Sequence, residues 1–120
     1  MRLSMSEVAN VVDELMELRA PRVLVRAARK GRIRSVECKM PRCYCPGGRD
    51  HFERSERPLG PWMPTADHIR RKMDGGTLAL VNVRLGHRLC NFADFARKKH
   101  VAFDRYLVKA LTDWYEGSRR

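Results

Sequence analysis

The chain has 120 residues, 43% of them hydrophobic, and 25 Lys and Arg against 14 Asp and Glu give a formal net charge of +11. This length predicts one small domain with a modest core, which an added cross-link such as a bound metal ion would stabilise. The charge favours nucleic acid as the partner, or else an anionic membrane surface. The chain has no apolar run of membrane-spanning length, and acids interrupt its N-terminal segment, so we expect a cytoplasmic protein without a signal peptide.

The first segment has the pattern of an amphipathic helix. Ser4 and Glu7 have the spacing of a capping box, in which each side chain bonds the backbone of the other. Pro21 ends this helix or opens the next element. The apolar positions between them fall on one helical stripe: Val8, Val11, Val12, Leu15 and Met16.

The next stretch, residues 21–37, is ambiguous, because Val23 to Val25 fit either a strand or a short helix. It is strongly basic, and its charges predict either a solvated face or a surface that contacts phosphates. The basic residues are Arg22, Arg26, Arg29, Lys30, Arg32 and Arg34. Residues 38–64 have the pattern of a loop, since Pro and Gly recur through them. A loop this long in a small domain is usually functional or anchored.

Strand patterns follow, and then helical ones. The stretch TADHI, residues 65–69, predicts a short strand, the Asp-Gly-Gly at 74–76 a turn, and residues 78–85 a second strand. Residues 87–100 have helical spacing and residues 101–117 predict a further helix. The apolar side chains expected on one side of the first of these helices are Leu89, Phe92, Phe95 and Ala96.

Two separated pairs of soft ligands predict a zinc site. Cys38 and Cys43 form C-x4-C, and His87 and Cys90 form H-x2-C much later in the chain. Thiols stay reduced in the cytosol, where such pairs indicate a metal more often than a disulfide. Tetrahedral Zn²⁺ accepts thiolate and imidazole together, and a closed four-coordinate site is structural. Cys45 could replace Cys38 or Cys43, or be a free thiol.

A second group of polar residues offers harder ligands. Asp67 and the two asparagines Asn82 and Asn91 carry side-chain oxygens, the ligand type that Mg²⁺ and Mn²⁺ prefer. His68 follows Asp67 directly. Neighbouring side chains on a strand point to opposite faces, so both serve one site only if the strand ends or bends there. Taken singly, each of these residues also fits an ordinary turn or helix start.

The order of these elements resembles the HNH endonucleases, a family with a ββα-metal fold. The resemblance lies in Asp67-His68 at the end of a first strand, a Gly-Gly turn, Asn82 entering a second strand, and Asn91 nine positions further on in the helix. The two zinc-ligand pairs also fall where many members carry theirs. The resemblance covers about residues 38–98, and the chain is similar to an H-N-N variant of the family.

The resemblance implies a role for each residue of the motif. His68 would be the general base that takes a proton from the attacking water, which requires a neutral imidazole, as an ordinary histidine has at pH 7. Asp67 and Asn91 would hold a single catalytic Mg²⁺ or Mn²⁺, and Asn82 would brace the loop that orients His68. The expected reaction is phosphodiester hydrolysis that leaves a 5′-phosphate and a 3′-hydroxyl.

The resemblance also implies an α+β fold and a partner. The fold would be one domain over 1–120, a small treble-clef-like ββα core with two antiparallel strands, a helical extension over 1–37 and the C-terminal helix over 101–117. The partner would be double-stranded DNA bound with weak sequence preference, in a bacterium or phage. Cutting both strands would take a homodimer, two successive events or a partner nuclease. The residues expected to contact DNA are Arg70, Arg71, Lys72, Arg84, Arg88, Arg97 and Lys98.

Two other functions fit the same sequence. One is a zinc-stapled nucleic-acid-binding module without catalysis, acting as a packaging or regulatory subunit. The other is a zinc-dependent interaction protein whose positive charge matches an acidic protein partner. The set of Asp67, His68 and Asn91 favours the nuclease, because a binding module needs no general base beside two oxygen ligands.

Overall fold

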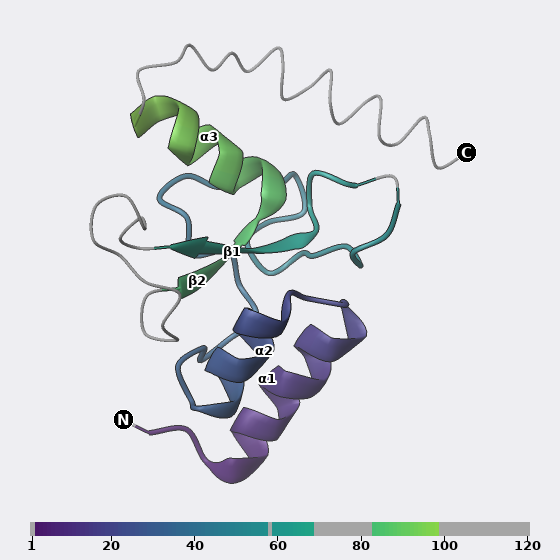
Figure 1. The fold of residues 1–120 in the computed structure, drawn as a ribbon, viewed down its shortest axis with the longest axis vertical. Helices are drawn as coiled ribbons and strands as arrows, with labels where there is room; N and C mark the ends of the chain where they lie inside the picture. The colour runs from purple at the N-terminus through teal and green to yellow at the C-terminus, as the bar shows by residue number, and fades with distance from the viewer. Residues whose placement is uncertain (1, 58, 69–82, 99–120) are drawn as a thin grey trace.

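The computed structural model describes residues 2–57, 59–68 and 83–98, without the side chains of His68, Arg97 and Lys98. The described part has an α+β fold with three helices and a two-stranded antiparallel sheet (Figure 1). This class is the one that the sequence predicts. The predicted turn at 74–76, Asn82 and the predicted helix over 101–117 lie outside the described residues. In order the elements are α1 (Met5–Glu17), α2 (Arg22–Arg29), β1 (Pro64–His68), β2 (Val83–His87) and α3 (Arg88–Lys98).

Helix α1 begins with the predicted capping box. The Glu7 backbone N–H donates to Ser4 Oγ at 3.1 Å, and the Ser4 backbone N–H donates to Glu7 Oε1 at 3.1 Å. The pKa of Glu7 is lowered, because the Ser4 backbone and side chain donate to its carboxylate. The predicted stripe buries Val11, Val12 and Leu15. Met16 is 54% exposed, so its place on the buried stripe was predicted wrongly.

The ambiguous stretch after Pro21 is the helix α2, which has Pro21 as its N-cap residue. Leu24, Ala27 and Ala28 are fully buried. Their spacing of three and four residues gives α2 one apolar face, and packing of that face overrides the β-propensity of the valines. The arginines of α2 are exposed on its other side.

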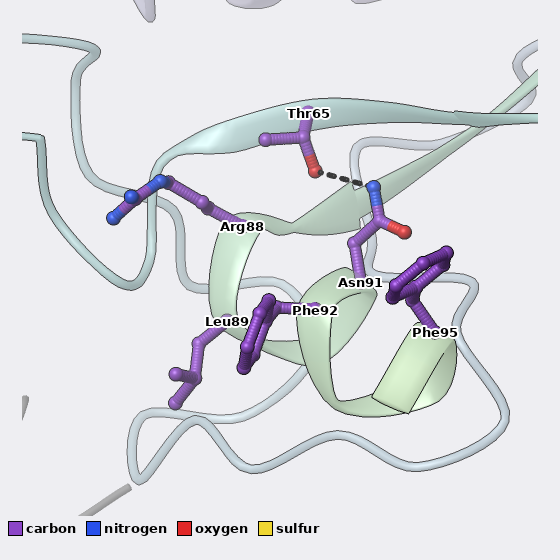
Figure 2. Close-up of a pocket in the computed structure, with 6 residues that line it drawn as sticks. All are labelled: Thr65, Arg88, Leu89, Asn91, Phe92 and Phe95. Atoms are coloured by element: carbon purple, nitrogen blue, oxygen red, sulfur yellow. Dashed lines mark hydrogen bonds between the residues drawn. The ribbon is translucent and has the colours of Figure 1, made fainter. Parts of the chain in front are cut away.

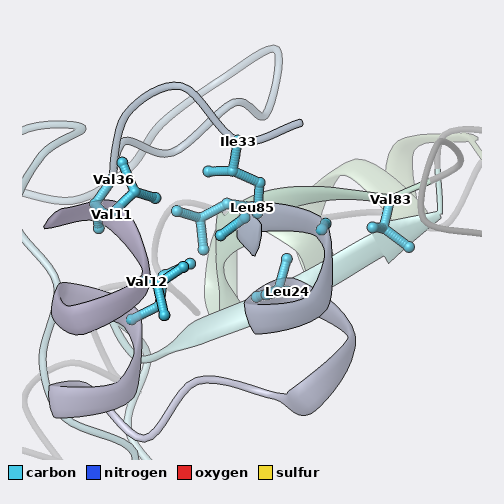
Figure 3. Close-up of a cluster of buried hydrophobic side chains, with 10 residues drawn as sticks. Val11, Val12, Leu24, Ile33, Val36, Val83 and Leu85 are labelled. Carbon is cyan, nitrogen blue, oxygen red and sulfur yellow. The ribbon is translucent and has the colours of Figure 1, made fainter. Parts of the chain in front are cut away.

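The hairpin pairs Pro64 with His87 at one end and His68 with Val83 at the other. Val83 and Leu85 of β2 are buried and pack with α1 and α2 in the larger of two apolar clusters (Figure 3). Ile33 and Val36, which follow α2, fill the same cluster. The two N-terminal helices therefore cover one side of the hairpin (Figure 1).

Helix α3 lies on the other side of the hairpin (Figure 1) and follows β2 without a loop. Its first backbone N–H groups, which have no partner inside a helix, donate to the carbonyls of Met63 and Pro61 at 2.9 Å each. Leu89, Ala93 and Ala96 are buried. Phe92 and Phe95 are 53% and 46% exposed, so the predicted apolar side of this helix was partly wrong.

The long segment between α2 and β1 contains no helix or strand among its described residues, as its Pro and Gly content predicts. Trp62 is 3% exposed and lies in the second apolar cluster, with Met40 and Leu89. No described helix combines the length and hydrophobicity that a bilayer crossing requires.

The Ser4→Ala substitution is expected to lower the free energy of unfolding by about 1 kcal/mol, because it leaves the Glu7 N–H of α1 without its side-chain acceptor. Urea unfolding measures this change. Ser6→Ala is the matched control, since Ser6 accepts no backbone hydrogen bond at the start of the helix. An equal loss in both variants would contradict a capping role for Ser4.

Candidate metal centre

The two predicted ligand pairs meet at the junction of β2 and α3. One ligand atom from each of Cys38, Cys43, His87 and Cys90 lies within 4.8 Å of all the others. The His87 Nδ1 atom is 3.5 Å from Cys43 Sγ and 3.7 Å from Cys90 Sγ. A Zn²⁺ tetrahedron with Zn–S of about 2.3 Å and Zn–N of about 2.0 Å would separate sulfur and nitrogen by about 3.5 Å. The four side chains therefore fit a metal ion such as zinc.

Three neighbouring residues fix the orientation of the His87 ring. Its Nε2–H donates to the carbonyl oxygen of His51, which leaves the lone pair of Nδ1 directed at the three sulfurs. Phe52 stacks on the ring at a centroid distance of 4.3 Å, and the Trp62 ring meets it edge-on at 5.7 Å. His87 is 0% exposed. This orientation is the one that a metal-bound histidine requires.

A hydrogen bond couples the thiols of Cys38 and Cys90. The pKa of Cys38 is lowered, first by a hydrogen bond from the Cys90 side chain and then by His87. The pKa of Cys90 is raised, because the same bond holds its proton against Cys38 and because it is buried. A metal ion bound between the two sulfurs would displace the proton of this bond. Backbone N–H groups of His87 and Tyr44 donate to the sulfurs of Cys38 and Cys90 at 3.5 and 3.3 Å.

Cys45 stands apart from these four residues. Its Sγ lies 3.8 Å from the carbonyl oxygen of His51, and the side chain is buried in the second apolar cluster. Its pKa is raised, chiefly because burial disfavours the thiolate. Cys45 does not belong to the group of four side chains whose ligand atoms lie within 4.8 Å of one another. The described geometry thus favours Cys38 and Cys43 over Cys45 as the upstream pair.

A backbone clamp fixes the loop that carries Cys38. The Arg49 guanidinium donates to the carbonyls of Cys38 at 2.9 Å, Met40 at 2.6 Å and Pro41 at 3.3 Å. The Lys39 N–H donates to the Leu85 carbonyl at 2.8 Å, which ties the loop to β2. These bonds anchor the predicted long loop independently of any metal.

The oxygen ligands predicted for a second metal lie on the α3 side of the hairpin. Asp67 pairs with Arg84 across the strands, and its Oδ2 accepts from Arg84 Nε at 2.7 Å. The side chains are 14% and 24% exposed, so the ion pair is partly buried. Arg84 Nη2 is also 3.9 Å from Asp94 of α3. Arg84, expected to contact DNA, is therefore positioned between two carboxylates.

Asn91 approaches the same face of β1. Its Nδ2 donates to Thr65 Oγ1 at 3.5 Å, and its amide oxygen points away from that hydroxyl (Figure 2). Thr65 and Asp67 are two residues apart in β1, so their side chains share one face of the strand, about 7 Å apart. Helix α3 thus brings Asn91 to the face that carries Asp67. His68 is the last residue of β1.

The structure describes some of the other predicted site residues. Arg88 is exposed at the start of α3, where its Nη1 donates to the Leu59 carbonyl at 3.4 Å. Arg97 and Lys98 belong to the last turn of α3. Asn82 and three basic residues of the predicted DNA surface, Arg70, Arg71 and Lys72, lie outside the described residues.

Sequence reasoning missed two residues that organise the site. Asp94 is 6% exposed. It is the only acidic residue of α3, and a single acid in a helix with several Arg and Lys could have been noticed in the sequence. It lies three residues after Asn91, on a neighbouring part of the helix surface. Arg49 has no comparable signal, because its partners are backbone carbonyls that the fold brings close.

No family model matches this chain, and comparisons with curated proteins and with solved structures also return no match.

Proposed function

We propose that this protein is a metal-dependent DNA endonuclease of the HNH type. The observation that carries the proposal is the approach of Asn91 to the strand face of Asp67, beside the group of four metal ligands at the start of α3. His68 ends the same strand. Asp67, His68 and Asn91 thus belong to one unit of two strands and a helix, which supports the proposal. A Cys₃His zinc centre would fix the angle between the hairpin and α3 and so hold Asp67 and Asn91 in place.

Each residue would have one task in the reaction. The Asp67 carboxylate and the Asn91 amide oxygen would hold a single Mg²⁺ or Mn²⁺, which suits oxygen ligands. When bound, this ion would offset the charge that develops at the scissile phosphate and leaving oxygen. His68 would take a proton from the attacking water. The products would carry a 5′-phosphate and a 3′-hydroxyl.

The charge of the chain supports DNA as the substrate. The formal charge of +11 would attract a polyphosphate and replace its counterions. Arg88 lines an open pocket of about 490 Å³ with Thr65 and Asn91, and its guanidinium is directed away from Asn91, where it would contact a phosphate further along bound DNA (Figure 2). Contacts of this kind position a phosphate and carry little sequence information. Three cysteine ligands also suit the reducing cytoplasm, where we place the protein.

A labelled DNA duplex incubated with the zinc-loaded protein tests the proposal. Cleavage is expected with Mg²⁺ or Mn²⁺ and is expected to stop in EDTA. The nicks should be sealed by DNA ligase without prior treatment, because ligase requires a 5′-phosphate and a 3′-hydroxyl. Nicks that ligase cannot seal would contradict the proposed mechanism, and binding without cleavage in any divalent metal would contradict the proposed activity.

One observation favours a second function, a zinc-stapled DNA-binding module without catalysis. Asp67 is already neutralised by Arg84 at 2.7 Å, and a partly buried ion pair would compete with a divalent cation for that carboxylate. Such a module would bind DNA equally well with metal or EDTA. The cleavage experiment above separates the two functions.

The Arg84→Gln substitution is expected to lower the Mg²⁺ concentration needed for half-maximal cleavage several-fold, because it removes the cation that competes for Asp67. A titration of Mg²⁺ at saturating DNA measures the change. Arg88→Gln is the matched control, since it removes the same charge from an exposed position that contacts no carboxylate within the described residues. An unchanged or higher Mg²⁺ requirement in Arg84→Gln would contradict competition at Asp67.

A further inference from the structure

Four arginines gather on the surface of the N-terminal helices, on the side of the molecule away from α3. Arg22, Arg26 and Arg29 are exposed on α2, and Arg19 is exposed just after α1. The four line an open groove of about 410 Å³, with Met16 and Val25 among its apolar contacts. Figure 1 shows that α1 and α2 lie across the hairpin from α3. The groove is therefore separate from Asp67 and Asn91.

The spacing of the α2 arginines places them on one line. Positions 22, 26 and 29 fall on a single face of a helix, spread over roughly 10 Å along its axis. The opposite face of α2 is the buried one, formed by Leu24, Ala27 and Ala28. All three guanidinium groups thus point away from the core toward the same side.

These arginines have no acidic partner in the part of the chain that the structure describes. The ion pairs there involve Lys39, His51, Arg54 and Arg84. Within the described residues, the side-chain hydrogen bond made by the groove arginines is that of Arg29 Nη2 with Met16 Sδ at 4.0 Å. Four arginines that form no ion pair among the described residues make a site for an external anion.

Arg19 gives an independent reason to expect a ligand. Its φ is 55°, the left-handed conformation that closes α1, with the Arg19 N–H donating to Met16 O and the Ala20 N–H to Leu15 O. Glycine adopts this conformation without the steric cost that a side chain brings. An arginine there costs stability, and its guanidinium lines the groove. The strain is explained if the side chain has a function.

We propose that this arginine groove is a second DNA-binding surface, which grips the phosphate backbone of duplex DNA independently of the nuclease site. Arginine suits this task, because its planar fork donates two hydrogen bonds to one phosphate and stays charged at every physiological pH. A line of three such groups follows successive phosphates along a strand. The surface would raise affinity without reading sequence.

DNA binding in EDTA tests the proposal apart from cleavage. Fluorescence anisotropy of a labelled duplex with the full zinc-loaded chain is expected to weaken at least tenfold in the triple variant R22Q/R26Q/R29Q at 0.1 M salt. The slope of log affinity against log salt should fall by about 2 to 3, since each phosphate contact contributes about 0.9. R22K/R26K/R29K should restore most of the slope.

The matched control is R2Q/R54Q/R57Q, which removes the same charge from exposed positions elsewhere on the described surface. Its affinity is expected to change less than about threefold. An equal loss in the two triple variants would show that net charge alone attracts DNA and would overturn the proposal. Unchanged DNA affinity in R22Q/R26Q/R29Q would also overturn it. So would a result in which this variant loses binding to anionic vesicles and keeps its affinity for DNA. If cleavage fails but the binding results hold, the groove stands and the nuclease does not.

Arg19→Gly gives a second, independent readout. The melting temperature is expected to rise, because glycine relieves the left-handed backbone, while DNA affinity falls. A purely structural role for Arg19 predicts no loss of affinity. A rise in stability with unchanged affinity would therefore overturn the part of the proposal that rests on Arg19.

Discussion

Replacing Cys90 with serine is expected to release the zinc and to lower the free energy of unfolding by at least about 3 kcal/mol. Structural Zn²⁺ binds small domains with about 10–16 kcal/mol, and the total stability of a folded domain is only about 5–15 kcal/mol. Cys90 is 1% exposed and touches both Cys38 and His87 of the four-residue centre. Its loss would leave a buried histidine and thiols without their cation.

Two measurements on the purified protein test this prediction, its zinc content and its thermal unfolding. Cys45→Ser is the matched control, because Cys45 is also buried but lies outside the four-residue centre. It should keep one zinc per chain and lose only about 1 kcal/mol. Retention of zinc in Cys90→Ser, or its loss in Cys45→Ser, would show that another set of ligands holds the metal.

Replacing His68 with alanine is expected to lower the cleavage rate by about 10²–10⁴-fold, because a positioned general base contributes about that much. Single-turnover cleavage of a labelled duplex at saturating protein measures the rate of the chemical step. Zinc content and DNA affinity should stay unchanged, since the substitution leaves the four residues of the metal centre and the arginines of the groove in place. Added imidazole should restore part of the lost rate by replacing the missing base.

His51→Ala is the control for this substitution. His51 supports His87 through its backbone carbonyl alone, and its side chain is 48% exposed beside Glu53. Removal of that imidazole should leave the cleavage rate within about twofold of the parent protein. A rate in His68→Ala equal to that of the parent would show that another group takes the proton.

Local patterns predicted most of the secondary structure and the metal ligands. The capping box at Ser4 and Glu7 depends on residues three apart, and a spacing of this kind can be found in a sequence. The pairs Cys38 with Cys43 and His87 with Cys90 are equally local, and the fold brings them together in one group that could hold a metal ion. The α+β class follows from these elements.

The features that were missed depend on tertiary contacts. Residues 22–29 have valines that suit a strand, and only the burial of Leu24, Ala27 and Ala28 against α1 and the sheet decides for a helix. The pairing of Arg84 with Asp67 follows from the register of the two strands, which local spacing does not specify. Spacing alone also placed Phe92 on a buried face that Leu89 and Ala93 occupy.

Relaxation of supercoiled plasmid is the most direct test of the proposed nuclease. Zinc-loaded protein is incubated with plasmid in Mg²⁺ or Mn²⁺, beside an EDTA sample and beside His68→Ala protein with the same zinc content. Nicking or linearisation that requires the added metal and disappears in His68→Ala is the result that we predict. An intact plasmid in every divalent metal, with folded and zinc-loaded protein that binds the DNA, would contradict it and favour the binding module.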